Sequence, residues 1–415
     1  MALDLAYLQK IINSWPAYRK YIENSGINPA RIKSIKDLPV LNKQFLRQAA
    51  NSLPINRIRY IVPSSGTTSG EFSYGLFGAQ EISNSTLSLE HHVNDYFQTN
   101  QKRTLLINVL PGAIAVNIPS VTVLPVGTRI DSALAAVRTF SGLFDQIIMV
   151  GEPVFVKNLL EEGAAAGIPW HLLPLHMILG GDWISETYRS YLGSILGIAN
   201  VFSSMGTAEL GLNYFFETVE TVLLRQILFQ KRAVRTALFG KTPFTPMVFF
   251  YDRKALYVET VRDENFSPVL ITTLSPKRIL PLIRYQIGDC GRVLSADEIN
   301  AALLKAGYPG FLKDEETGIF AHFGRGMSIG NIYPEQVKEI LYRAEIADLV
   351  TGNFHMVPDY RPVLNIQLKK GVRLTAGIKA RFRAAFPRID ILLKLCDFNH
   401  FPCPLDYERK IQYIA

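Results

Sequence analysis

Apolar and polar positions along the chain follow two alternating patterns. Short apolar or β-branched runs, such as "RIRYIV", "QIIMV", "HMILGG" and "VLITTL", have the length and composition of buried strands. Between them lie stretches with helical spacing, such as "EISNSTLSLEHHVNDYF" and "SETYRSYLGSIL". Residues 1–50 also read as helices. Strands interleaved with helices predict an α/β fold in which helices cover the β-sheets.

The pattern changes near Phe323. A Gly-rich passage, "FGRGMSIGNIY", leads into a helix with Pro334 in its first turn, and then come the strand "PVLNIQLKK", the helix "AGIKARFRAAF" and the strand "IDILLKL". We therefore predict a large N-terminal domain over residues 1–323. A small α+β domain over residues 324–415 would follow it, hinged at the glycines.

One charge-free stretch, Thr104 to Thr128, is 25 residues long and could span a bilayer. It contains Pro111, Pro119 and Pro125, each of which would break a helix. The sequence therefore favours buried strands joined by turns, and no membrane segment.

Composition and charge narrow the classes of protein. Hydrophobic residues make up 48% of the 415 and charged residues 19%, which is typical of a globular protein. The net charge of +8 comes from scattered Lys and Arg without a recognition motif, so nucleic acid is not expected as a partner. Residues 326–415 hold 13 Lys and Arg against 9 Asp and Glu. This end could meet a polyanion, such as a phosphorylated cofactor or an acidic carrier protein, or could be a solvated basic face.

The N-terminus and the cysteines indicate a cytoplasmic protein. "MALDLAYLQK" has no basic leader and no small-residue cleavage site, unlike a secretory signal. The three cysteines are odd in number and widely spaced, which fits a reducing compartment better than a disulfide framework.

The stretch "IVPSSGTTSGEF" places glycines and hydroxyls after a predicted strand. It lacks the lysine and the following helix of a Walker-type loop. Backbone N–H groups and hydroxyls permit anion binding here, but such a cluster alone is more often an ordinary loop.

Five motifs occur in one order along the chain: "SSGTTSG", "SSMGTAELG", "LIRYQIGDCGRV", "FGRGMSIGNIYPEQVKE" and "PLDYERKIQYI". In this order they resemble the signature motifs of the acyl-adenylate-forming enzymes. "WPAYRKYIENSGINPARIKSIKDLPVLNKQFLR" and "ILGGDWISETYRSYLG" resemble the phenylacetate-CoA ligase branch in particular. The similarity covers nearly the whole chain.

The resemblance implies ATP-dependent activation of a carboxylic acid to acyl-AMP, with release of pyrophosphate, and then transfer to a thiol such as CoA. The branch and the apolar stretch "NVLPGAIAVNIPS" favour an aromatic or otherwise apolar acid. Alternative acceptors are a phosphopantetheine carrier protein or an amine. A non-catalytic nucleotide-binding relative is a further alternative. Similar enzymes are often homodimers.

The resemblance also assigns roles to residues. Glu209 matches the acid that holds Mg²⁺, Asp289 the carboxylate that accepts the ribose hydroxyls, and Arg325 an arginine that reaches the nucleotide. Lys410 matches the catalytic lysine that bridges carboxylate and phosphate oxygens; the nearby Ile411 and Ile414 suggest a docked tail. The remaining ATP-binding candidates are the pyrophosphate loop, Ser64, Ser65, Gly66, Thr67 and Thr68, the segment beside adenine, Gly181 and Asp182, and the nucleotide loop, Gly206, Thr207 and Ala208.

Three departures from the family pattern stand out. Glu71 lies where positive charge is expected after the loop, and Ala208 replaces a hydroxyl residue that would contact the α-phosphate. Between Arg325 and Pro334 the passage is shorter than usual and lacks the expected acidic hinge residue. This weakens the expectation of the thioester-forming step more than that of adenylation.

Overall fold

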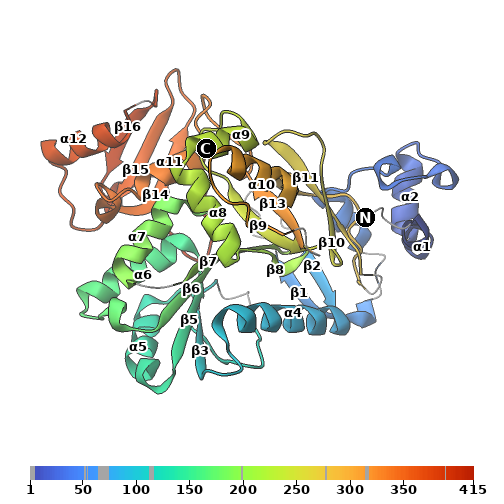
Figure 1. Cartoon of the computed structure of the whole chain (residues 1–415), viewed down its shortest axis with the longest axis horizontal. Coiled ribbons are helices and arrows are strands. Elements are labelled where there is room, and N and C mark those ends of the chain that lie inside the picture. The colour runs from blue at the N-terminus through green and yellow to red at the C-terminus, as the bar shows by residue number, and fades with distance from the viewer. Residues whose placement is uncertain are drawn as a thin grey trace. The chain divides into compact units, whose positions relative to one another are not determined.

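The computed structural model describes residues 5–50, 53, 55–63, 74–111, 116–197, 200–275, 278–313, 317–387 and 389–415. Figure 1 shows its helices and strands and labels those for which there is room. The chain forms two compact units. The first comprises Met1–Ser88, Gly206–Phe216 and Val248–Arg325, and the second comprises Leu89–Met205, Glu217–Met247 and Gly326–Ala415. Because these units group the segments in another way, the domains over residues 1–323 and 324–415 stay a prediction.

The first unit begins with helices, as the sequence predicts. The rings of Trp15, Tyr18 and Phe45 pack against one another at centroid distances of 5.5 to 6.0 Å and hold this region together. The helical elements are α1 (Leu5–Ser14), α2 (Pro16–Asn24), η1 (Pro29–Arg31), η2 (Ile35–Asp37), α3 (Lys43–Ala50) and η3 (Ile55–Arg57).

The strands of the first unit form two sheets. An antiparallel pair joins β1 (Ile58–Pro63) to β2 (Tyr74–Gly78). The larger sheet has the strand order β10-β11-β12-β13-β9-β8. Its elements, with the helix that follows β12, are β8 (Gly211–Phe216), β9 (Met247–Asp252), β10 (Leu256–Thr260), β11 (Ser267–Thr273), β12 (Tyr285–Leu294), α10 (Ala296–Lys305) and β13 (Thr317–His322).

The second unit contains a parallel sheet with the strand order β7-β6-β5-β3-β4. Every residue of β3 is buried, as expected for a parallel strand with both faces covered. The strands are β3 (Thr104–Asn108), β4 (Thr122–Pro125), β5 (Gln146–Gly151), β6 (Leu175–Leu179) and β7 (Val201–Thr207). The helical elements are α4 (Ala79–Phe97), which enters this unit after Ser88, α5 (Ile130–Phe140), η4 (Ser141–Leu143), α6 (Pro153–Ala165), η5 (Trp170–Leu172), α7 (Glu186–Leu196), α8 (Val219–Gln230) and α9 (Arg232–Phe239).

The charge-free stretch of residues 104–128 therefore forms β3 and β4, and the prediction of strands joined by turns is confirmed over its described residues. None of the described helices combines the length and the apolar content needed to cross a membrane.

The C-terminal part of the second unit holds a three-stranded sheet in which β14 pairs antiparallel and β16 pairs parallel with β15. Its elements are α11 (Pro334–Leu341), η6 (Ala347–Leu349), β14 (Val350–Val357), β15 (Val363–Leu368), α12 (Ala376–Ala385), β16 (Leu392–Cys396) and η7 (Phe398–His400). The predicted helix-strand-helix-strand unit omitted β14. Thr351 and Asn353 interrupt its apolar pattern, yet both are buried, because they hydrogen-bond to Gln367 on β15.

The C-terminal tail is docked, as its apolar residues suggested. Met356 of β14 donates its N–H to the carbonyl of Tyr413 at 2.8 Å and accepts from the N–H of Ala415 at 3.0 Å. Tyr413 and Ile414 also pack against the core around β14 and β15.

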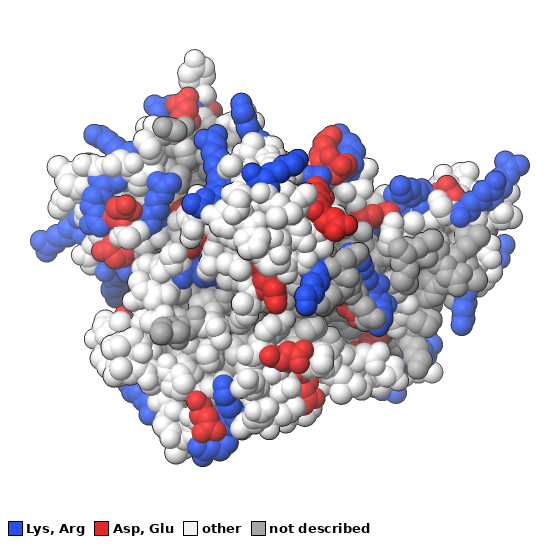
Figure 2. Space-filling model, in the orientation of Figure 1, with Lys and Arg blue, Asp and Glu red and all other residues white. Residues whose placement is uncertain are grey.

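Basic side chains occur on the surface of this C-terminal part, for example Lys379, Arg381 and Arg383 on α12. Figure 2 shows that Lys and Arg are interspersed with Asp and Glu over the face in view. Arg381 itself lies 3.5 Å from the Asp348 carboxylate.

Candidate active site

Glu209 lies in the turn between β7 and β8, and its residue is only 3% exposed. The hydroxyl of Tyr285, the first residue of β12, donates to Oε1 of Glu209 at 2.8 Å. Burial, together with the charge of Glu209 and this hydrogen bond, raises the pKa of Tyr285 well above its ordinary value, so the phenol stays a donor. Glu209 is therefore a buried, hydrogen-bonded carboxylate and not a solvated residue of a loop.

Arg278 fixes the backbone of the same turn. Its Nη2 donates to the carbonyl of Glu209 at 2.8 Å, and its Nε lies 3.4 Å from the carboxylate of Glu81. Glu81, in the first turn of α4, also accepts from the N–H groups of Gly78 and Ile279 at 2.9 and 3.0 Å. Buried contacts thus join the end of β2 to the turn that carries Glu209.

The start of β2 packs closely against the backbone of this turn. A Cβ on Gly75 would lie 1.7 Å from the carbonyl oxygen of Ala208, so only glycine fits there. β2 follows the predicted pyrophosphate loop; Ser64, Ser65, Gly66, Thr67 and Thr68, like Glu71, lie outside the described residues.

The predicted nucleotide loop is a tight turn. Gly206 and Thr207 end β7, and a Cβ on Gly206 would lie 2.2 Å from the carbonyl oxygen of Gly211. The Thr207 hydroxyl accepts from the N–H of Leu210 at 3.2 Å. Ala208 adds no hydroxyl to this turn.

Asp289 lies in a β-bulge of β12. Pro268 on β11 pairs with Cys290 on β12, and Leu270 pairs with Gln286. An advance of two residues along β11 is therefore matched by four residues along β12. Gly288 within the bulge has φ +93°, a conformation that glycine adopts readily. Oδ1 of Asp289 lies 3.6 Å from Nε2 of His322.

Arg325 lies on the backbone segment that pairs with the one carrying Asp289. Cys290 donates its N–H to the carbonyl of Gly324 at 2.7 Å and accepts from the N–H of Phe323 at 2.9 Å. The structure therefore brings together two candidates that lie 36 residues apart in sequence, Asp289 and Arg325.

In the second unit, Asp182 follows β6 and meets two residues that lie within the quoted motifs but to which the resemblance assigned no role. Nζ of Lys338 on α11 lies 2.6 and 2.7 Å from its two oxygens, and the Tyr413 hydroxyl donates to Oδ2 at 2.7 Å. Nζ of Lys338 also lies 4.0 Å from the centroid of the Tyr413 ring. Although burial favours the protonated acid, Lys338 and these hydrogen bonds hold the pKa of Asp182 below its ordinary value.

Glu152, the residue before α6, packs its carboxylate against Gly181. A Cβ on Gly181 would lie 2.5 Å from Oε1 of Glu152, and Gly181 has φ +85°. Burial raises the pKa of Glu152 to about 7, while the positive charge of Lys410 opposes the rise. The positive charge of the candidate catalytic lysine therefore acts on a partly buried carboxyl group beside the predicted adenine segment.

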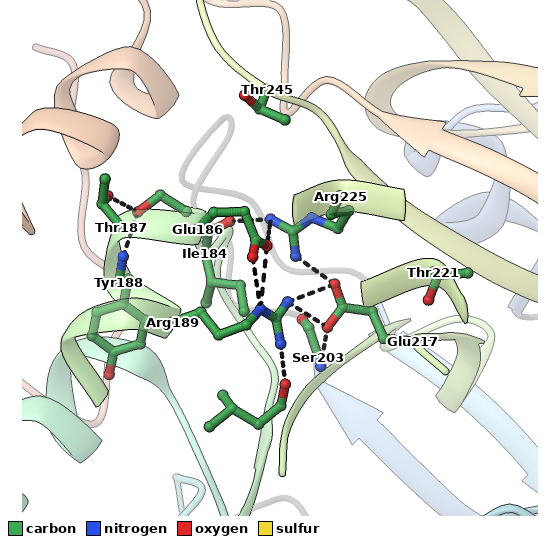
Figure 3. A network of polar contacts seen from close by, with 12 residues as sticks. Ile184, Glu186, Thr187, Tyr188, Arg189, Ser203, Glu217, Thr221, Arg225 and Thr245 are labelled. Carbon is green, nitrogen blue, oxygen red and sulfur yellow. Dashed lines mark hydrogen bonds and ion pairs between the residues drawn. The ribbon is translucent and has the colours of Figure 1, made fainter. Parts of the chain in front are cut away.

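Four buried charged residues form a network that contacts β7 (Figure 3). They are Glu186, Arg189, Glu217 and Arg225. Glu217 accepts from Arg189 at 2.9 Å through both oxygens, from Arg225, and from the N–H of Ser203 at 2.7 Å. Glu186 completes the network through Arg189 and Arg225. The network fixes β7 at the point where "SSMGTAELG" begins. These residues give no local sequence pattern, and sequence reasoning missed them.

The described residues contain no cluster of three or more His, Cys, Asp or Glu that could hold a metal ion alone. Mg²⁺ does not require such a cluster, because it is commonly held by one or two carboxylates together with substrate phosphates.

Comparison with solved structures identifies the fold of the chain. No protein-family model and no curated protein sequence matches the chain. Among solved structures, 2-hydroxyisobutyryl-CoA ligase in the postadenylation state, in complex with 2-HIB-AMP, superposes with a TM-score of 0.68 at 15% identity, covering 99% of this chain and 88% of that one. The chain has the fold of the acyl-adenylate-forming ligases.

Two further structures of this fold are similar at lower coverage. The anthranilate CoA ligase AuaEII in complex with anthranoyl-AMP has a TM-score of 0.55 at 12% identity and covers 85% of this chain and 66% of that one. The o-succinylbenzoate CoA synthetase MenE from Bacillus subtilis, in complex with its acyl-adenylate, has a TM-score of 0.51 at 14% identity, covering 87% and 69%. The phenylacetate-CoA ligase branch stays a prediction.

Proposed function

We propose that the chain uses ATP and Mg²⁺ to convert a small aromatic or apolar carboxylic acid into acyl-AMP, releasing pyrophosphate, and then transfers the acyl group to the thiol of CoA. The observation that carries the proposal is the environment of Glu209. The acid in "MGTAE" is buried and oriented by Tyr285 and Arg278, as a ligand-holding group requires.

Mg²⁺ fits the donor chemistry of Glu209. A carboxylate oxygen is the protein ligand that Mg²⁺ prefers, and a protonated Tyr285 orients the carboxylate. The ion would supply positive charge to the phosphates during adenylation.

The other candidates fit ATP and the acid. Asp289 offers two carboxyl oxygens for the ribose hydroxyls, and Arg325 offers a cation from the adjacent backbone segment. Lys410 would stabilise the charge shared by the acid and the α-phosphate. Ser64 to Thr68 keep the role in pyrophosphate binding that the motif suggests. Gly181, Gly206, Thr207 and Ala208 would line the nucleotide.

A carrier-protein thiol or an amine is the second candidate acceptor. Only eight residues separate Arg325 from Pro334, and the hinge acid is missing. A short passage favours an enzyme in which the second step differs from that of a typical CoA ligase.

ATP–pyrophosphate exchange with a panel of aromatic and fatty acids tests the proposal. We expect exchange with at least one acid, its loss in Glu209→Gln and Lys410→Ala, and its retention in Arg409→Ala, whose side chain is 84% exposed and paired with Asp406. Adding CoA to the active acid should yield the acyl thioester. Exchange with no acid of the panel, or exchange that needs no acid, would contradict the proposal.

A further inference from the structure

The segment that carries Lys410 is anchored on both sides within the second unit. Three residues before Lys410, the ring of Tyr407 packs edge-on against Phe155 of α6 at 5.0 Å. Next to it, Glu408 accepts a hydrogen bond from the hydroxyl of Thr128. The ends of a chain usually fray unless contacts hold them. These contacts therefore restrict the motion of the segment before Lys410.

Three residues after Lys410, Tyr413 makes the second anchor. Its ring stacks on Phe354 of β14 at 4.4 Å, and its hydroxyl donates to Asp182 at 2.7 Å. Burial and the neighbouring acids raise the pKa of Tyr413 well above its ordinary value, so it remains a donor.

Lys338 completes this arrangement. It is 4% exposed, pairs with both oxygens of Asp182 and lies over the Tyr413 ring. Because Lys338 neutralises Asp182, that carboxylate does not compete with ATP and the acid for Lys410.

We propose that Asp182, Lys338 and Tyr413 form a clamp that positions Lys410 for the adenylation half-reaction. This inference rests on the proposed function. None of the three needs to touch the reacting atoms, because they act by restricting the tail that carries the lysine. Held geometry lowers the entropic cost of bringing a catalytic group to its substrate. Since Lys410 serves adenylation, the clamp should matter for that step and not for acyl transfer to CoA.

Tyr413→Phe tests the clamp, because it removes the hydroxyl and keeps the ring on Phe354. The matched control is Tyr407→Phe, the same change on the same tail, which keeps the ring on Phe155. We expect Tyr413→Phe to lower kcat of ATP–pyrophosphate exchange about tenfold, the size expected for a lost hydrogen bond to a charged group, with KM for ATP changed less than twofold. Tyr407→Phe should stay within about twofold of the wild type.

The second half-reaction separates positioning from general structural damage. With synthetic acyl-AMP and CoA, Tyr413→Phe should form thioester at the wild-type rate. Lys338→Met should lose exchange more strongly, and Lys338→Arg should restore part of it, because an arginine can still pair with Asp182.

Three outcomes would overturn the clamp. These are equal exchange in Tyr413→Phe and Tyr407→Phe, an equal loss of both half-reactions in Tyr413→Phe, and no recovery in Lys338→Arg relative to Lys338→Met. If the wild type exchanges with no acid, the proposed function fails and the clamp fails with it. An active wild type with an unaffected Tyr413→Phe refutes the clamp alone.

Discussion

Replacing Glu152 with glutamine should change how the stability of the protein depends on pH. The charged groups that act on Glu152 are Lys410, Asp182, Lys338 and Glu408, and burial dominates over all of them in raising its pKa from 4.5 to about 7. The folded state therefore holds the proton more tightly than the unfolded chain. The resulting stabilisation is complete below pH 4.5 and is lost as the pH rises through about 7.

The size of the effect follows from the shift. One pKa unit corresponds to about 1.4 kcal/mol, so a rise from 4.5 to about 7 corresponds to about 3 kcal/mol. Glutamine resembles the protonated acid and cannot ionise. The free energy of unfolding of Glu152→Gln, minus that of the wild type, should therefore increase by about 3 kcal/mol between about pH 4.5 and pH 8.

Urea unfolding at several pH values measures this difference. Trp170 and Trp183 are buried in the same unit and report its unfolding by fluorescence. The matched control is Glu162→Gln, an exposed glutamate on α6, whose curve should run parallel to that of the wild type. A constant difference between Glu152→Gln and the wild type across this range would refute the reasoning.

Three further changes test the buried contacts. Glu217→Gln should lower the free energy of unfolding by about 3–5 kcal/mol in urea, because two buried arginines would then share the single remaining carboxylate of Glu186; a cost below about 1 kcal/mol would contradict the network's importance. Tyr285→Phe should raise the Mg²⁺ concentration needed for exchange about tenfold, because Glu209 loses the donor that orients it; an unchanged Mg²⁺ titration would argue against Glu209 as the ligand. Gly75→Ala should cost about 1–3 kcal/mol and reduce exchange, because its Cβ would overlap the carbonyl of Ala208; wild-type stability and activity would show that the strand can move away at little cost.

The fold could be predicted from the sequence where apolar periodicity is regular. "QIIMV" forms β5 and "SETYRSYLGSIL" lies on α7, because their apolar residues face a core. β14 was not predicted, because its apolar periodicity is interrupted. Thr351 and Asn353 point polar groups into the interior, and only the partner on β15 makes their burial tolerable.

The candidate site could be predicted only as isolated residues. Motif order pointed to Glu209, but Tyr285 and Arg278 lie 76 and 69 positions away from it. Asp182 likewise meets Lys338 across 156 positions and Tyr413 across 231. Such pairs produce no recognisable pattern in the sequence, because the fold alone decides which distant side chains come into contact.

Two lysines of the second unit, Lys338 on α11 and Lys410 in the C-terminal tail, interact with different carboxyl groups. Lys338 pairs tightly with Asp182, whose pKa is lowered, so this ion pair persists at neutral pH. Lys410 instead acts on Glu152, whose pKa of about 7 means that the carboxyl group is protonated for much of the time near neutrality. A carboxyl group that is often neutral attracts a lysine less than a permanent carboxylate does. This weak attraction suits the proposed function, in which the ammonium group of Lys410 binds phosphate and not a protein carboxylate.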